Sequence, residues 1–219
     1  MIRFLLIIIG GLGISWRISA ALYTWTGLAG PSWTNSGSWT PNGVPGPGDQ
    51  AILSAGSTTF AGTGSVQQIE LKGGALDVTG TLSVTGTFTW SSGTLGGTGG
   101  TTTITDGATL IWSGNTGRNL AAGHRLLNGT NGLIRASLTA TGSPTLSGSG
   151  IIENWGKILI ETNVTLRVSG EFRQRGGVVQ CDGEAVFQSG SFDFQGGRLE
   201  GLVRAFNEFI VTIQHNASL

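Results

Sequence analysis

The sequence predicts an all-β fold, namely a right-handed parallel β-helix (a β-solenoid) with a Trp/Pro-rich cap at its N-terminal end. Three observations lead to this prediction. Gly accounts for 39 of the 219 residues, whereas charged residues make up only 11% of the chain. Apolar and polar residues alternate over short segments that end at Gly, which is typical of half-buried strands. After the first residues, no segment has the apolar spacing of three and four residues that predicts an amphipathic helix.

Residues 1–21 have the features of a secretory signal peptide. Arg3 supplies a positive charge, an uncharged apolar run extends from Phe4 to Ile14, and Ser19-Ala20-Ala21 offers small residues for cleavage after Ala21. The run is shorter than the roughly 20 residues that a membrane-spanning helix needs. We therefore expect a secreted or cell-surface protein that has no membrane span after signal removal.

Residues 22–50 form the predicted cap. They contain Trp25, Trp33 and Trp39 and four of the five prolines of the chain. Pro cannot donate a hydrogen bond to a sheet, so this segment is not a central strand. Because the end of a solenoid exposes unpaired backbone and an open core, we expect the indole rings to cover the first coil. We expect the carboxylate of Asp49 to accept backbone hydrogen bonds from the adjacent turn.

Residues 51–219 form the predicted β-helix. From about Leu71 the chain consists of units of six or seven residues, such as TLSVTG, TTTITDG and EAVFQSG. Apolar residues alternate within these units, Thr fills intervening positions, and Gly stands at corners such as Gly80 and Gly93. A sandwich or barrel normally has turns every 8–12 residues or so, so these shorter strands favour coils that stack on one another.

Three units give a coil of roughly 20 residues, so we expect about eight coils. Asn131 begins an Asn-containing corner that recurs at Asn154, 23 residues later. Asn side chains at equivalent corners can stack as a hydrogen-bonded ladder, and coincidental turn asparagines are the alternative. Only the segment from Gly117 to Leu127 is expected to hold a helical turn. Cys181, the single cysteine, is expected to be a small buried residue.

Several segments resemble a known group of proteins. They are the opening motifs WTG, WTN and SWTPNGVPGPGDQAIL, the Gly/Thr-rich TFTWSSGTLGGTGGTTTITDGATL, and the later NWGKILI and FDFQGGRLEG. Together they resemble the β-helical repeat regions of bacterial secreted and surface proteins of the autotransporter and adhesin type. The resemblance covers most of the chain after residue 21. It implies a structural or adhesive role and contributes no catalytic residues.

The chain offers few residues for catalysis. His124 and His215 are far apart and have no second ligand at metal-binding spacing, so no metal or cofactor is expected. The zero net charge gives no electrostatic footprint for nucleic acid. Glu171, Asp182 and Asp193 are the best candidates for the paired carboxylates of a polysaccharide lyase or glycoside hydrolase, which is the enzymatic alternative. The arginines interleaved with them instead favour solvated ion pairs between coils, so we predict no catalytic residue.

Carbohydrate binding is the main alternative function. Residues 22–117 contain five charged residues and residues 118–219 contain 17, so the N-terminal half presents an almost uncharged Thr/Ser/Gly surface. Stacking on aromatic rings would contribute to glycan binding, and the competing interpretation is that these rings pack in the core. The candidates for contacting carbohydrate are Trp25, Trp33, Trp39, Trp90 and Trp112. Candidates for glycosylation are Asn128, Asn163 and Asn216, which stand in sequons.

The predicted function is that of a secreted or cell-surface structural or adhesion module without catalytic activity, whose partner is a glycan or another surface ligand. A carbohydrate-binding or polysaccharide-degrading β-helix is the alternative. Ice binding is a minor alternative, because rows of Thr on a flat solenoid face can order water. The segments Thr101-Thr102-Thr103 and Thr87-Phe88-Thr89 suggest such rows, but the chain lacks a regular Thr-X-Thr motif in every coil.

Overall fold

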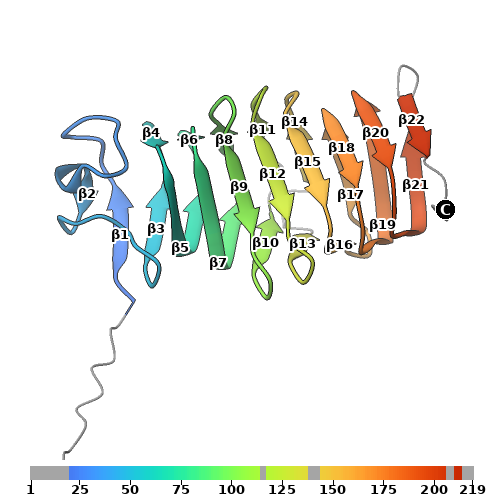
Figure 1. Cartoon of the computed structure of the whole chain (residues 1–219), viewed down its shortest axis with the longest axis horizontal. Helices are drawn as coiled ribbons and strands as arrows, with labels where there is room; N and C mark the ends of the chain where they lie inside the picture. Colours follow the sequence, from blue (N-terminus) through green and yellow to red (C-terminus); the bar gives the residue numbers. More distant parts are fainter. Residues whose placement is uncertain (1–19, 114–116, 138–143, 206–209, 214–219) are drawn as a thin grey trace, which may run out of the picture.

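The computed structural model describes residues 20–113, 117–137, 144–205 and 210–213. Its strands wind into a β-solenoid of about seven turns (Figure 1). Within the described residues, helical structure is limited to the 3₁₀ turn η1 (Ser36–Ser38), and antiparallel pairing to β1 (Leu22–Trp25) with β2 (Trp39–Thr40). The predicted parallel all-β solenoid is therefore confirmed, with about one coil fewer than expected.

No helix in the described part of the chain is long and apolar enough to cross a membrane. Residues 1–19 of the predicted signal peptide lie outside the described residues.

Each full coil contributes to three parallel faces. Face A contains β1, β3 (Gln50–Leu53), β10 (Thr109–Trp112), β13 (Leu133–Ala136) and β16 (Lys157–Ile160). Face B contains β4 (Ser57–Phe60), β6 (Ala75–Val78), β8 (Gly93–Gly96), β11 (Arg118–Leu120), β14 (Thr145–Ser147) and β17 (Thr165–Ser169). Face C contains β9 (Thr101–Ile104), β12 (Arg125–Asn128), β15 (Ile151–Asn154), β18 (Glu171–Gln174), β20 (Ser191–Phe194) and β22 (Ile210–Ile213).

Four longer strands pass through a corner and belong to two faces. These strands are β5 (Thr63–Leu71) and β7 (Thr81–Trp90), which join faces C and A, and β19 (Val178–Ser189) and β21 (Arg198–Ala205), which join faces A and B. Each coil is thereby hydrogen-bonded to the next along its whole circumference.

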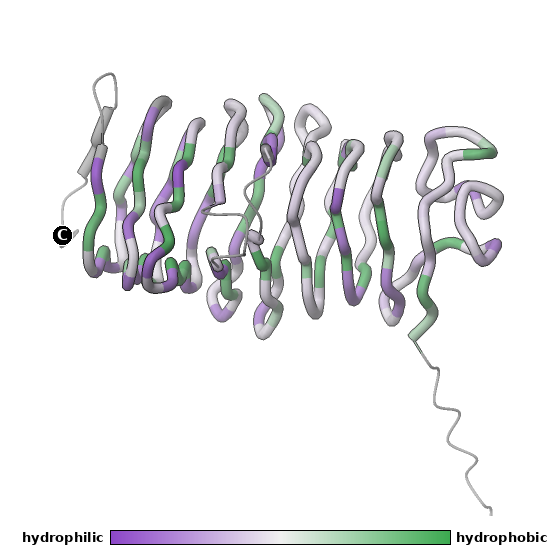
Figure 2. Tube along the Cα trace, turned by 180° about the vertical axis from the view of Figure 1, so that it is seen from behind, coloured by the Kyte–Doolittle hydropathy of each residue, from purple (hydrophilic) through white to green (hydrophobic). Residues whose placement is uncertain are grey.

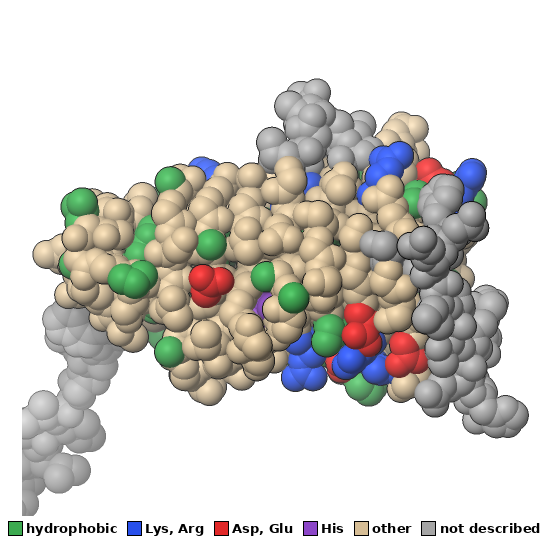
Figure 3. Space-filling view, turned by 90° about the horizontal axis from the view of Figure 1, so that it is seen from above, with side chains coloured by type: hydrophobic (Ala, Val, Ile, Leu, Met, Phe, Trp, Pro, Cys, Tyr) green, Lys and Arg blue, Asp and Glu red, His purple; other side chains and the backbone are tan. Residues whose placement is uncertain are grey.

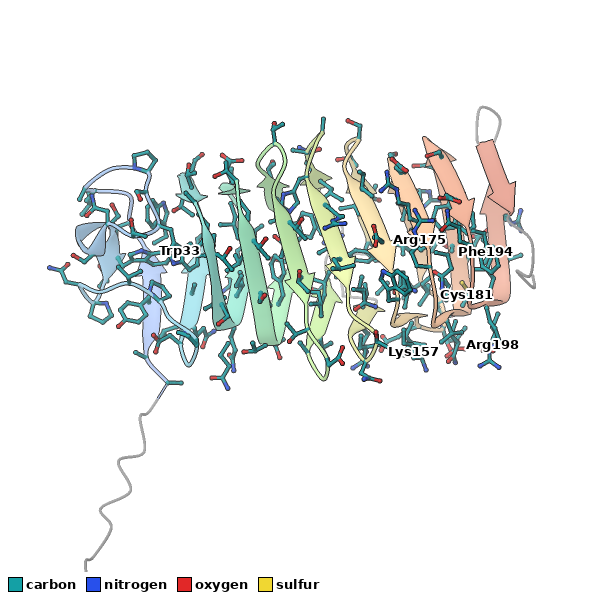
Figure 4. The ribbon with its side chains drawn as sticks, viewed as in Figure 1. Trp33, Lys157, Arg175, Cys181, Phe194 and Arg198 are labelled. Atoms are coloured by element: carbon teal, nitrogen blue, oxygen red, sulfur yellow. The ribbon has the colours of Figure 1, made fainter. Side chains whose placement is uncertain are left out.

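Side chains alternate between the interior and the surface along the strands, as the period of two requires. In β10, for example, Leu110 and Trp112 are buried and the residues between them face outward. Figure 2 shows hydrophobic positions recurring at equivalent places in successive coils. Figure 4 shows Cys181 and Phe194 within the stack. Cys181 is buried, as predicted, and burial raises the pKa of its thiol to about 11.

Coil length varies along the chain. Thr63 pairs with Thr81, 18 residues later, whereas Arg125 pairs with Ile151, 26 residues later. The additional residues lie in the corners, so the strands keep their register. The helical turn expected between Gly117 and Leu127 is wrong, because this segment forms β11, a corner and the start of β12. Its buried residues follow the alternation of strands.

Gly80 stands where the backbones of two coils approach most closely. A Cβ atom at this position would lie 1.8 Å from the carbonyl oxygen of Gly62. Gly80→Ala is therefore expected to lower the free energy of unfolding by about 1–3 kcal/mol, which urea denaturation would measure. Gly48→Ala is the matched control, because a Cβ there meets no atom within 4 Å. Equal stability of the two variants would contradict the close approach.

Face C contains a column of buried polar side chains. Asn128, Asn154 and Gln174 pair in register at the ends of β12, β15 and β18, and all three are fully buried. Nδ2 of Asn128 donates to Oδ1 of Asn154 (2.7 Å), and Nδ2 of Asn154 donates to Oε1 of Gln174 (2.9 Å). We call these three residues the amide ladder. The same column continues with Ile104 on one side and Phe194 on the other.

The predicted Asn ladder therefore has a different register from the observed one. The partner of Asn154 is Asn128 and not Asn131, because the coil that joins the strands at this point has 26 residues. Asn131 lies at an exposed corner, where its backbone N–H and its Nδ2 donate to the two carboxylate oxygens of Asp106, both at 3.1 Å. Asn154 was correctly expected at a stacked position.

His124 is another polar side chain in the interior. One ring nitrogen lies 3.3 Å from the carbonyl oxygen of Gly97, and the other lies 3.1 Å from Oγ1 of Thr102. Burial lowers the pKa of His124 to about 4, against the opposing effect of backbone hydrogen bonds. The imidazole is therefore neutral in the folded protein at pH 7.

Acidification is expected to destabilise the protein through His124. Below its ordinary pKa of about 6.5 the unfolded chain binds a proton at this residue, whereas the folded chain binds it only near pH 4. This linkage should lower the free energy of unfolding by about 3 kcal/mol between pH 7 and pH 4, with no effect above pH 7. Urea titrations of wild type and His124→Gln would measure it. Equal pH slopes in the two proteins would exclude His124 as the cause.

Residues 22–50 lie at the N-terminal end of the stack (Figure 1). Trp25 and Trp33 each pack edge-to-face against Trp39, with ring centroids 4.9 and 4.7 Å away, and Trp33 packs against Phe60 of β4. Nε1 of Trp39 donates to the carbonyl oxygen of Trp33 (2.8 Å). Figure 4 shows Trp33 inside this end of the molecule. We call Trp25, Trp33 and Trp39 the Trp cluster; its role as a cap stays a prediction.

Asp49 connects the N-terminal segment to the first coil. Its Oδ2 accepts a hydrogen bond from the backbone N–H of Gly46 (2.9 Å), as expected from the sequence. Its Oδ1 accepts one from the backbone N–H of Ala21 (2.9 Å). β3 begins at the next residue and pairs in parallel with β1. The carboxylate therefore fixes two backbone segments beside the first face of the solenoid.

Candidate functional site

The five tryptophans predicted to contact carbohydrate are all interior residues, each exposed by 6% or less. They are Trp25, Trp33 and Trp39 of the Trp cluster, and Trp90 and Trp112 in adjacent strands of face A. The alternation that places the last two in strands also turns them inward, and the first three pack on one another. The structure corrects this assignment, because a buried ring has no face to offer to a sugar.

Trp25 borders a pocket of about 380 Å³ at the N-terminal end. The other residues that line it are Thr26, Gly27, Gly30, Pro31, Ala55, Gly56 and Ser57. Nε1 of Trp25 is buried and has no hydrogen-bond partner. Gly27 and Gly56 shield it, since a Cβ at these positions would lie 3.4 and 3.5 Å from the nitrogen. The pocket carries no charged side chain, and its buried donor is out of reach of a ligand.

Trp155 is the tryptophan that faces solvent within the described residues, with 43% of its surface exposed. It occupies the corner between β15 and β16. Its Nε1 donates to Oε1 of Glu153 (3.0 Å). Its ring also lies beside Gly176 of the next coil, where a Cβ would be 3.5 Å from Cε3. The indole is thus held at two points and remains open to solvent.

Glu153 belongs to an ion-pair network across three coils. Its Oε2 lies 3.6 Å from Nη1 of Arg125 on β12 and 4.0 Å from Nη1 of Arg173 on β18. Nε of Arg173 also donates to Oε1 of Glu171 (2.5 Å), and this hydrogen bond is the main cause that raises the pKa of Arg173. We call Trp155, Glu153, Arg125 and Arg173 the Trp155 surface. Figure 3 shows charged side chains gathered over the C-terminal half of the solenoid.

Sequence reasoning did not select Trp155 as a site residue. The tripeptide Asn154-Trp155-Gly156 served only as a marker of coil periodicity. The available signal was that Trp155 directly follows the last inward position of a strand, so it leaves the alternation and lies in a corner. Large aromatic residues inside the alternating pattern are buried, whereas one placed in a corner has no interior position to fill.

The acidic residues considered for catalysis bind basic or amide groups. Glu171 pairs with Arg173, Oδ2 of Asp193 accepts from Nη1 of Arg175 (2.7 Å), and Oδ1 of Asp182 accepts from Nε2 of Gln180 (2.9 Å). The outer column of face C alternates in sign through Glu153, Arg173 and Asp193. The expected ion pairs between coils are therefore present. Within the described ranges, no three His, Cys, Asp or Glu side chains are placed to hold a metal ion.

The three sequons differ in their surroundings. Asn128 is fully buried in the amide ladder, so its side chain is not available for glycosylation in the folded protein. Asn163 is exposed in the corner before β17 and has a positive φ of 65°. Asn216 lies outside the described residues. Of the two sequons that the structure describes, only Asn163 has an accessible side chain.

Comparison of the chain with protein-family models, with curated proteins and with solved structures found no match in any of the three. The fold and the surface geometry therefore carry the functional inference.

Proposed function

We propose that this protein is a secreted or cell-surface β-solenoid that acts as a structural or adhesive module and catalyses no reaction. The observation that carries the proposal is the continuous parallel stacking of about seven coils, which yields three long faces with regular outer columns. Adjacent positions in such a column are about 4.8 Å apart, so one type of contact can repeat along the molecule. Repeated weak contacts suit adhesion, because linked contacts strengthen one another.

The pairing of the acidic residues supports a non-catalytic role. A glycosidase needs two carboxyl groups that act together on one glycosidic bond. Glu171 and Asp193 instead each bind an arginine of their own, and their ion pairs lie on the outer side of face C. This arrangement is typical of surface ion pairs that neutralise one another between coils.

Ice binding has limited geometric support. Thr63, Thr81 and Thr101 follow one another in an outer column of face C. The next residue in this column is Arg125, which interrupts the row of hydroxyl groups. The row therefore extends over three coils, and the arginine that follows is unsuited to matching an ice surface.

Secretion and adhesion can be tested together with a C-terminally tagged full chain. We expect the exported protein to begin at Leu22 by N-terminal sequencing and to bind to immobilised cell-wall material without releasing reducing sugars. A cytoplasmic protein with an intact Met1, or hydrolysis of pectin or alginate, would contradict the proposal. Hydrolysis that disappears in Glu171→Gln or Asp182→Asn would support the enzymatic alternative instead.

A further inference from the structure

We propose that the Trp155 surface is a binding site for a neutral glycan, with the indole ring as the stacking platform for one pyranose. The inference rests on the adhesive function proposed above, because it names the class of ligand and the residues that contact it.

Trp155 has the two properties that a stacking platform needs, namely exposure and a fixed orientation. Its ring is 43% exposed, whereas the five other described tryptophans are buried. The hydrogen bond from Nε1 to Glu153 and the contact with Gly176 hold the ring in place. A ring fixed in this way loses little conformational entropy when it binds a ligand. The apolar face of a pyranose can then cover a surface that otherwise exposes an indole to water.

The groups beside the ring can bind sugar hydroxyls. The side chain of Glu153 is only 12% exposed and is held by Trp155, Arg125 and Arg173. A carboxylate has about four acceptor positions and a guanidinium has five donors. Each group therefore keeps hydrogen-bonding capacity beyond its partners in the network. Hydroxyl groups both donate and accept, so they complement a rim that holds acceptors and donors side by side.

The charge of the site favours a neutral ligand. Arg125 and Arg173 are balanced by Glu153 and Glu171, which are within ion-pair distance of them. An anionic glycan would have to displace one of these carboxylates, whereas a neutral one leaves the pairs intact. A protein partner is less favoured, because an interface hot spot is normally surrounded by residues that exclude water. Charged side chains surround Trp155 instead.

Binding of the full chain to cellohexaose, mannohexaose and chitohexaose, measured by calorimetry, tests the proposal. Oligogalacturonate serves as the anionic probe. We expect at least one neutral probe to bind, and Trp155→Ala to weaken its binding about tenfold or more. Glu153→Gln should weaken it several-fold, because the indole loses a charged acceptor. Leu28→Ala is the matched control, since Leu28 is 86% exposed at the distant N-terminal end.

Unaltered binding in Trp155→Ala, binding of oligogalacturonate alone, or no binding of any neutral probe would overturn the proposal. Urea denaturation of Trp155→Ala shows whether the variant remains folded. If it does not, wild-type protection of Trp155 from acrylamide quenching by the bound probe decides instead. The adhesive function is judged separately. Adhesion to cell-wall material that persists without glycan binding rejects only the site, whereas loss of both rejects the proposed function too.

Discussion

Asn154→Ala is expected to lower the free energy of unfolding by about 3–5 kcal/mol. Asn154 is the central residue of the amide ladder and is fully buried. Its removal leaves Oε1 of Gln174 without the donor observed at 2.9 Å and deprives Nδ2 of Asn128 of the acceptor at 2.7 Å. A buried polar atom without a partner costs about 1–3 kcal/mol, and the cavity adds to this cost. Urea denaturation at pH 7 would measure the change.

Two further proteins separate the ladder from a general effect of mutation. Asn131→Ala removes an exposed amide and should cost about 1 kcal/mol or less. The triple variant Asn128→Leu, Asn154→Leu and Gln174→Leu extends the apolar column formed by Ile104 and Phe194, so it should be more stable than Asn154→Ala. If Asn131→Ala and Asn154→Ala were equally stable, the ladder would have no energetic role.

Trp39→Ala is expected to lower the free energy of unfolding by about 3–5 kcal/mol, the usual range for a buried aromatic residue. Trp39 is 1% exposed, packs against both other members of the Trp cluster and donates a hydrogen bond to the carbonyl oxygen of Trp33. Leu28→Ala, in the same segment, should change stability by less than about 0.5 kcal/mol, because its side chain is exposed.

Hydrogen exchange shows whether this loss reflects a cap. In a solenoid each coil contacts only its neighbours, so damage at one end should stay local. We expect Trp39→Ala to accelerate amide exchange in β3 and β4 and to leave β18 and β20 protected under native conditions. Unchanged exchange in β3 and β4 would mean that the Trp cluster stabilises its own segment without capping the solenoid.

The fold was predictable because the alternation of apolar residues and the spacing of Gly are local properties of the chain. Leu82 and Val84, for example, occupy inward positions in β7 as their spacing requires. The closely spaced corners distinguished stacked coils from a sandwich. Asp49 could also be placed, since its bonds to the adjacent turn involve residues close to it in the sequence.

The site was not predictable, because it depends on coil length. The register that joins Asn128 to Asn154 and Glu153 to Arg173 is set by residues inserted in the corners, which no average coil length reveals. The exposed aromatic was also missed. Trp90 is embedded in the alternating pattern and is buried for that reason, whereas Trp155 lies in a corner and is exposed.

Spin-label distances along face A test the stacked-coil architecture most directly. Gln50, Gln68, Thr87 and Arg198 belong to one outer column, in which Arg198 is seven, six and five coils from the other three. With labels at Arg198 and at one of the other positions, in a Cys181→Ala background, we expect mean distances of about 34, 29 and 24 Å. A regular decrease of about 4.8 Å per coil would agree with the parallel solenoid. Distances that do not decrease in this order would contradict it.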